Sequence, residues 1–197
     1  MSLLLQHLFP SLTWRFPTSE KTLYLTFDDG PIPEVTSWIL NTLDDFNAKA
    51  TFFCIGDNAK KYPLLMMMLN NSKHSIGNHT MHHLNGWQTN NKKYYTDISE
   101  CKQFVNSELF RPPYGKIKLS QTWHLKKEFR IIMWDVLSRD YDISLSGEDC
   151  FENVKKNTRN GSIIVFHDSL KAEKRLRFAL PATLKYFSEM GYTFAAI

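Results

Sequence analysis

Two adjacent acids, Asp28 and Asp29, directly follow the apolar run 23–27. Ionised carboxylates are costly to place beside a hydrophobic strand unless something at that place uses their charge. Further along the chain, His79 and His83 lie four residues apart. One acid and two histidines supply three ligands for a catalytic zinc ion and leave a fourth position open. The second acid is then free to act as a base toward a metal-bound water, so the pattern predicts a metal-dependent hydrolase.

The elements that must position these residues alternate between strands and helices. Short apolar, β-rich runs predict seven strands, at residues 23–27, 50–55, 74–78, 109–111, 130–136, 162–167 and 192–197. Stripes of apolar residues with helical spacing predict helices at 35–46, 64–69, 94–105, 120–129, 147–160 and 174–190. Such alternation is typical of a parallel sheet covered by helices. Seven strands favour a closed or nearly closed α/β barrel over an open sheet.

Polar residues stand at or just past the carboxyl ends of several predicted strands: Asp28, Asp29, Arg111, Asp135, His167 and Asp168. In parallel α/β folds, and in barrels especially, that edge carries the active site. The alternative is that such acids only cap the following helix, as Asp57 or Asp168 would. Capping explains one acid at a time and leaves the histidines unexplained, so we expect a site at this edge.

Composition places the chain among ordinary globular proteins. Its 197 residues fit one domain, with 43% hydrophobic and 22% charged residues. The net charge of +4 is modest and scattered, which does not favour binding of nucleic acid. The aromatic content of 14% suits either stacking on sugar rings or a packed core.

The cysteines and the N-terminus bear on the compartment. Cys54, Cys101 and Cys150 are odd in number and have no CxxC spacing, so we expect no disulfide framework, which is compatible with a reducing compartment. Residues 1–10 lack the features of a secretory signal peptide, and no apolar stretch is long enough to span a membrane. These observations predict a cytoplasmic protein, unless an export signal has been trimmed from it. Nothing in the sequence indicates an oligomeric state.

Five short motifs occur in one order: Thr26-Phe27-Asp28-Asp29-Gly30, His79-x-x-x-His83, Arg111-Pro112-Pro113-Tyr114-Gly115, Trp134-Asp135 to Arg139-Asp140, and Val165-Phe166-His167-Asp168. Together they resemble the motifs of the polysaccharide deacetylase family, metal-dependent carbohydrate esterases that include chitin and peptidoglycan deacetylases. The resemblance implies a catalytic domain over residues 21–197 after an N-terminal extension, 1–20. It also implies a distorted (β/α)7 barrel in a single domain.

The same resemblance implies a ligand set and a base. Asp29, His79 and His83 would bind the metal, which would be Zn²⁺, with Co²⁺ or another divalent ion as the alternative. Motif register favours His83 over the adjacent His82. Asp28 would be the general base.

Further roles follow from the third motif. Arg111 would position Asp28, because a guanidinium fork suits a carboxylate; the alternative is a surface arginine before a Pro-Pro turn. The backbone N–H of Tyr114 would help to stabilise the oxyanion.

The last two motifs imply the acid and the pocket. His167 would be the general acid, oriented by Asp140, with Asp135 as a rival for that role. Tyr141, where the family usually has Trp, would line the acyl pocket with the pair Val165 and Phe166.

The sequence thus predicts a zinc-dependent enzyme that removes acetyl groups from N-acetylglucosamine in an oligo- or polysaccharide. O-acetyl xylan and non-sugar amides remain alternative substrates for the same site. The alternative hypothesis from another functional class is a non-catalytic carbohydrate-binding protein. Loss of Asp28 or His167 would have favoured that hypothesis.

Overall fold

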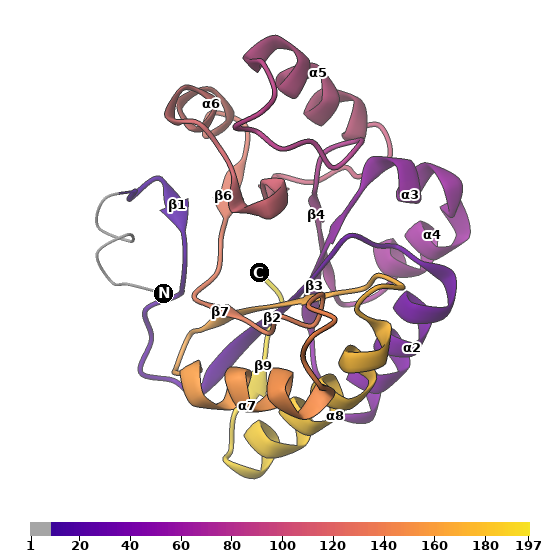
Figure 1. Cartoon of the computed structure of the whole chain (residues 1–197), viewed down its shortest axis with the longest axis vertical. Helices are drawn as coiled ribbons and strands as arrows, with labels where there is room; N and C mark the ends of the chain where they lie inside the picture. Colours follow the sequence, from indigo (N-terminus) through magenta and orange to yellow (C-terminus); the bar gives the residue numbers. More distant parts are fainter. Residues whose placement is uncertain (1–8) are drawn as a thin grey trace.

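The computed structural model describes residues 9–197, which form a parallel sheet curled into a distorted barrel (Figure 1). The strands pair in the order β1-β6-β5-β4-β3-β2-β8-β7, and β9 pairs with β2. Their bounds are β1 Leu12–Thr13, β2 Thr22–Asp28, β3 Ala50–Cys54, β4 Ser75–Asn78, β5 Leu109–Phe110, β6 Arg130–Ile132, β7 Val136–Leu137, β8 Ile163–His167 and β9 Thr193–Phe194. The predicted (β/α)7 barrel in a single domain is confirmed.

Helices cover the outside of the barrel. They are α2 Pro33–Asp45, α3 Gly56–Lys61, α4 Pro63–Asn71, α5 Asn91–Cys101, α6 Leu119–Leu125, α7 Gly147–Asn157 and α8 Glu173–Glu189, with a 3₁₀ turn, η1, at Pro113–Gly115. Local sequence explains several starts: Pro33 opens α2, and Ser146 and Asp149 form a capping box at α7. The six predicted helices are present, and α3 is an addition that the sequence did not predict.

The predicted strand 130–136 is wrong as one element, because it divides into β6 and β7. The carbonyl groups of Ile132 and Met133 turn away from ladder pairing and accept hydrogen bonds from the buried Arg111 side chain. β6 pairs with β5, whereas β7 pairs with β8. The connection between them therefore carries the chain from β6, beside β1, to β7 at the opposite end of the strand order.

The residues before position 21 contribute to the barrel where the structure describes them. Leu12 and Thr13 pair with β6, and Trp14 packs in the core with Phe110 and Ile131. The folded unit therefore begins before residue 21, and the rest of the expected extension, 1–8, lies outside the described residues.

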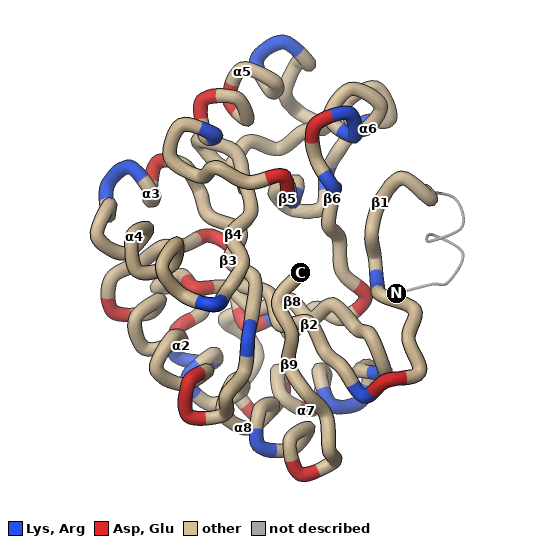
Figure 2. Tube along the Cα trace, turned by 180° about the vertical axis from the view of Figure 1, so that it is seen from behind, with Lys and Arg blue, Asp and Glu red and all other residues tan. Residues whose placement is uncertain are grey.

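The core sits between the central strands and the helices. β3 is buried along its whole length, and β8 is buried except at His167. Strands covered on both faces are expected to be continuously apolar. Outside this core, Lys and Arg are interspersed with Asp and Glu over the helices (Figure 2). Among the described helices, none is both long and apolar enough to cross a bilayer.

Candidate active site

A cavity of about 390 Å³ opens at the carboxyl edge of the central strands. Its wall is formed by Asp28, Asp29, His79, His83, Tyr114, Trp134, Leu137, Tyr141, Val165, His167, Ser169 and Lys171. Strand register explains the convergence, because Asp28 at the end of β2 lies beside His167 at the end of β8. The site therefore lies at the strand edge that the sequence predicted.

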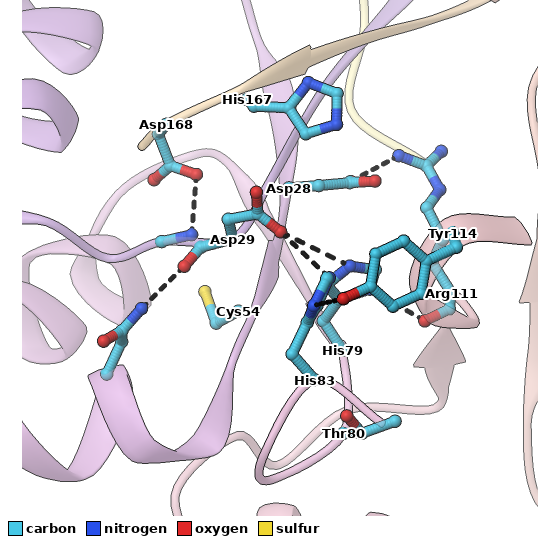
Figure 3. Close-up of polar contacts among 12 residues, drawn as sticks. Asp28, Asp29, Cys54, His79, Thr80, His83, Arg111, Tyr114, His167 and Asp168 are labelled. Atoms are coloured by element: carbon cyan, nitrogen blue, oxygen red, sulfur yellow. Dashed lines mark hydrogen bonds and ion pairs between the residues drawn. The ribbon is translucent and has the colours of Figure 1, made fainter. Parts of the chain in front are cut away.

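Asp29, His79 and His83 form a compact group of possible metal ligands (Figure 3). One ligand atom from each residue lies within 4.8 Å of the other two. The Asp29 Oδ1 is 3.2 Å from His83 Nε2 and 3.7 Å from His79 Nε2. This donor set, two imidazole nitrogens and a carboxylate, is one that suits zinc.

The two imidazoles are oriented by their other nitrogens. His79 Nδ1 donates to the carbonyl oxygen of Arg111 over 2.8 Å, and His83 Nδ1 lies 3.0 Å from the Tyr114 hydroxyl. Because Nδ1 of each ring has a partner, Nε2 of each ring is left to face Asp29. Partners of this kind fix the tautomer and the direction of metal-binding histidines.

The protonation states of Asp29 and His79 at neutral pH favour the binding of a cation. Burial lowers the pKa of His79 to about 4. Burial raises the pKa of Asp29, but the His83 hydrogen bond and the nearby imidazole charges outweigh it and lower this pKa to about 2. At neutral pH a carboxylate therefore faces a neutral imidazole, which is the protonation state that metal binding requires.

Backbone strain is concentrated here. Six non-glycine residues among those described have positive φ, and four of them belong to the site: Asp29, Thr80, His83 and Tyr114, at 86°, 64°, 54° and 60°. Such conformations are rare for residues with a Cβ and cluster at functional sites. The segment 79–83 is thus a strained turn and not a helix, which settles how two histidines four apart share one face.

Asp28 and Arg111 form an ion pair inside the barrel. Arg111 is fully buried, and its Nη1 donates to Asp28 Oδ1 over 2.6 Å and to Thr26 Oγ1 over 2.7 Å. The remaining guanidinium nitrogens donate to main-chain carbonyls, and the guanidinium lies 4.1 Å above the Phe53 ring. Arg111 is therefore not a surface residue. It holds Asp28 through one nitrogen and not through a two-pronged fork.

His167 and Asp140 form the second charged pair. Asp140 is fully buried and accepts from His167 Nδ1 over 2.7 Å and from the His167 backbone N–H over 2.8 Å. Burial lowers the pKa of His167, but the Asp140 carboxylate, with smaller contributions from Asp29 and Asp28, outweighs it and raises this pKa to about 9. Asp135, the rival, instead accepts from Ser162 and Ile163 near the start of β8, so the structure places Asp140 beside His167.

The two expected pocket residues of β8, Val165 and Phe166, lie on opposite faces of the strand. Val165 and Tyr141 line the cavity, and the Tyr141 ring stands edge-on to His167 at 5.2 Å. Phe166 points into the core, fully buried and stacked on Phe27 at 6.0 Å. Because side chains alternate along a strand, residues 165 and 166 cannot both face the cavity.

Several residues of the wall were missed by sequence reasoning: Trp134, Leu137, Ser169 and Lys171. Trp134 belongs to the fourth motif, and this position in the motif could have indicated that it lies at the site. Leu137 lies within the span of the fourth motif, and Ser169 and Lys171 lie one and three residues after the last motif. The types of these three residues gave no indication that their side chains face the cavity.

Three further polar residues, Asp168, Asp57 and His82, make contacts other than those of a helix cap. Asp168 accepts from the Gly30 N–H and the Thr36 hydroxyl, so it ties the loop after β8 to the loop that carries Asp29. Asp57 lies in the first turn of α3, 3.9 Å from His82 Nε2. His82 points away from the three ligands, and its Nδ1 contacts Asp97 at 2.5 Å.

Comparison with known proteins agrees with this geometry. Residues 15–130 match the family model described as polysaccharide deacetylase. A peptidoglycan-N-acetylglucosamine deacetylase of Bacillus cereus is 33% identical over 194 residues, covering 94% of this chain and 91% of the relative. A chitooligosaccharide deacetylase of Azorhizobium caulinodans is 33% identical over 162 residues, covering 78% of this chain and 77% of the relative.

Among solved structures, the Bc1960 peptidoglycan N-acetylglucosamine deacetylase, in complex with an N-oxidanyl-benzamide, superimposes with a TM-score of 0.92 at 30% identity. The match covers 100% of this chain and 95% of that one. The fold, the order of the motifs and these matches agree, and the chain belongs to the polysaccharide deacetylase family.

Proposed function

We propose that this protein is a metal-dependent deacetylase of N-acetylglucosamine units in an oligo- or polysaccharide. One observation carries the proposal: two hydrogen-bonded charge pairs, Asp28 with Arg111 and His167 with Asp140, lie beside the Asp29 group, and Asp28 and His167 line the same cavity. A base and an acid on two sides of a reacting carbonyl are what amide hydrolysis requires.

Zn²⁺ fits the donor set of Asp29, His79 and His83, because one carboxylate oxygen and two imidazole nitrogens lie within 4.8 Å of one another. At neutral pH Asp29 is ionised and His79 is neutral. When bound, a divalent cation supplies a Lewis acid that makes water more acidic and polarises the acyl oxygen. Co²⁺ is an alternative occupant of the same donors.

Asp28 is the base in this proposal. It is not one of the three metal donors, and Arg111 fixes its carboxylate by a hydrogen bond to Oδ1. Asp28 lines the cavity, so its carboxylate is available to take a proton from the attacking water.

His167 is the acid. Its Nδ1 is held by Asp140, which leaves Nε2 to deliver a proton to the departing nitrogen. With its pKa raised to about 9, the ring is protonated at neutral pH, as an acid must be at the start of the reaction.

The oxyanion has a donor in the backbone of η1. Tyr114 lines the cavity in a left-handed conformation, and among the described residues its N–H has no hydrogen-bond acceptor. An unsatisfied donor at the cavity wall is suited to stabilise developing negative charge.

The test is acetate release from N-acetylglucosamine oligomers by the purified protein, before and after chelation and with Zn²⁺ restored. We expect release that stops with chelator and returns with Zn²⁺. Release from acetylated xylan alone would assign the protein to the O-acetyl esterases. Absence of hydrolysis with every acetylated sugar and non-sugar amide, despite bound metal, would favour a non-catalytic carbohydrate-binding protein.

A further inference from the structure

The turn that presents His79 and His83 is held by a residue from a different part of the chain. Asp97, in α5, is 5% exposed. Its Oδ1 accepts the backbone N–H of Met81 over 2.8 Å and that of His82 over 3.2 Å. Two consecutive N–H groups thus converge on one carboxylate oxygen.

His82 completes this arrangement. Its Nδ1 lies 2.5 Å from Asp97 Oδ2, the oxygen that the backbone leaves free. The imidazole therefore fixes the rotation of the carboxylate, with both oxygens occupied. The His82 ring is half-exposed, at 49%, and it does not line the cavity that Asp29, His79 and His83 line.

Several other backbone groups of the turn are satisfied within the turn or by β3 and α3: the His79 N–H donates to the Cys54 carbonyl oxygen. The Thr80 N–H is taken by Asn78 Oδ1, and the Leu84 N–H by Thr80 Oγ1. The carbonyl oxygens of residues 80 and 81 accept the N–H groups at the start of α3. Among the described residues, Asp97 is the acceptor that reaches the middle of the turn from outside it.

The turn needs such an acceptor because it is strained. Thr80 and His83 both have positive φ, and such conformations persist only when their surroundings over-determine them. Backbone N–H groups left without an acceptor lose the hydrogen bond that offsets their removal from water. Without Asp97, relaxation of the turn would move His83 away from Asp29.

We propose that Asp97, locked in place by His82, is a positioning residue that sets the geometry of the metal ligands His79 and His83 before the metal binds. The inference rests on the metal site of the proposed function. It also gives His82 a role distinct from that of its neighbour: His83 binds the metal, and His82 holds the residue that places it.

The experiment measures binding of Co²⁺ to the full-length, metal-free protein, by chelator competition and by the visible absorption of the bound ion. We expect Asp97→Ala to bind Co²⁺ about 10–100-fold more weakly than wild type, since loss of groups that orient metal ligands has effects of that size. The absorption spectrum of its bound ion should also change. Asp97→Asn keeps an oxygen for the two N–H groups, so it should restore most of the affinity.

Asp135→Ala is the matched control. Asp135 is a buried acid, 8% exposed, that accepts from the Ile163 N–H and the Ser162 hydroxyl away from the ligands. We expect Asp135→Ala to lower the melting temperature, as Asp97→Ala does, but to bind Co²⁺ with the affinity of the wild type.

Wild-type affinity in folded Asp97→Ala, or equal losses in Asp97→Ala and Asp135→Ala, would overturn the inference. If Asp97→Ala does not fold, His82→Ala decides the matter: a several-fold loss of Co²⁺ affinity supports it, and an unchanged affinity overturns it. Wild-type protein that binds no Co²⁺ would instead refute the metal site of the proposed function.

Discussion

Replacement of Asp140 by Asn tests the assignment of His167 as the acid. Burial lowers the pKa of His167, but the Asp140 carboxylate, with smaller contributions from Asp29 and Asp28, raises it from 6.5 to about 9. At 1.36 kcal/mol per pKa unit, this rise corresponds to ~3 kcal/mol of stabilisation of the imidazolium. In Asp140→Asn the largest part of that stabilisation is lost while burial, Asp29 and Asp28 remain, so the pKa of His167 should fall from about 9 toward 6.5.

The consequence for activity depends on pH. An acid must be protonated, so wild-type kcat/KM should fall as pH rises through the pKa of His167. At pH 8, about nine-tenths of His167 is protonated if its pKa is about 9, and about 0.03 if it falls to 6.5. Asp140→Asn should therefore lose up to about 30-fold in kcat/KM at pH 8 and much less at pH 5.5. A bound cation opposes protonation of His167, so both proteins are compared at equal metal occupancy.

The assay is acetate release from N-acetylglucosamine oligomers between pH 5 and pH 10. The control is Asp142→Asn, which removes a partly exposed carboxylate that pairs with Arg139 and does not contact His167. An alkaline limb that stays in place in Asp140→Asn would refute the assignment of His167 as the acid.

Stability gives an independent check of the same pair. Because the folded pKa of His167 lies above its unfolded value, the pair stabilises the fold fully below about pH 6.5, and this contribution is lost as pH rises through about 9. Asp140→Asn should therefore lower the melting temperature more at pH 6 than at pH 9.5. An equal loss at both values would mean that the imidazolium contributes nothing to stability.

Three other substitutions test separate parts of the site. Asp28→Asn should keep its metal, measured by elemental analysis, while turnover falls about 10²–10⁴-fold; loss of metal instead would make Asp28 a ligand. His83→Ala should abolish stoichiometric metal, whereas His82→Ala should only weaken its binding, and the opposite order would exchange the two assignments. Phe166→Ala should lower the free energy of unfolding by about 3–5 kcal/mol with KM unchanged, and a changed KM would place Phe166 at the substrate.

Much of the site could be predicted because of one property of parallel barrels. The carboxyl ends of the strands meet at a single edge, so acids and histidines that follow apolar runs are brought together even when far apart in sequence. That rule places Asp28, His79, Arg111 and His167 without any knowledge of the loops. It depends only on where each strand ends, which an apolar run followed by a polar residue shows.

The face of a strand on which a side chain lies was harder to predict from the sequence. β8 is buried on both faces, so its sequence lacks the alternation of polar and apolar residues that would show which side faces the cavity. Phe166 was therefore expected in the pocket, although strand geometry allows only one of two neighbours there. The break at residues 133–135 was hidden for a similar reason, because the buried Arg111 that satisfies its carbonyl groups lies elsewhere in the sequence.

Residues that hold the metal ligands in place were the hardest to predict from the sequence, and Asp97 shows why. It stands in a helix with no motif around it, and its chemistry is directed at backbone N–H groups, which every residue carries. Nothing in the types of Met81 or His82 indicates that their N–H groups need an acceptor, because that need arises from the positive φ of Thr80 and His83. Sequence patterns reveal residues whose side chains do chemistry, whereas the partners of a strained turn emerge only from its three-dimensional course.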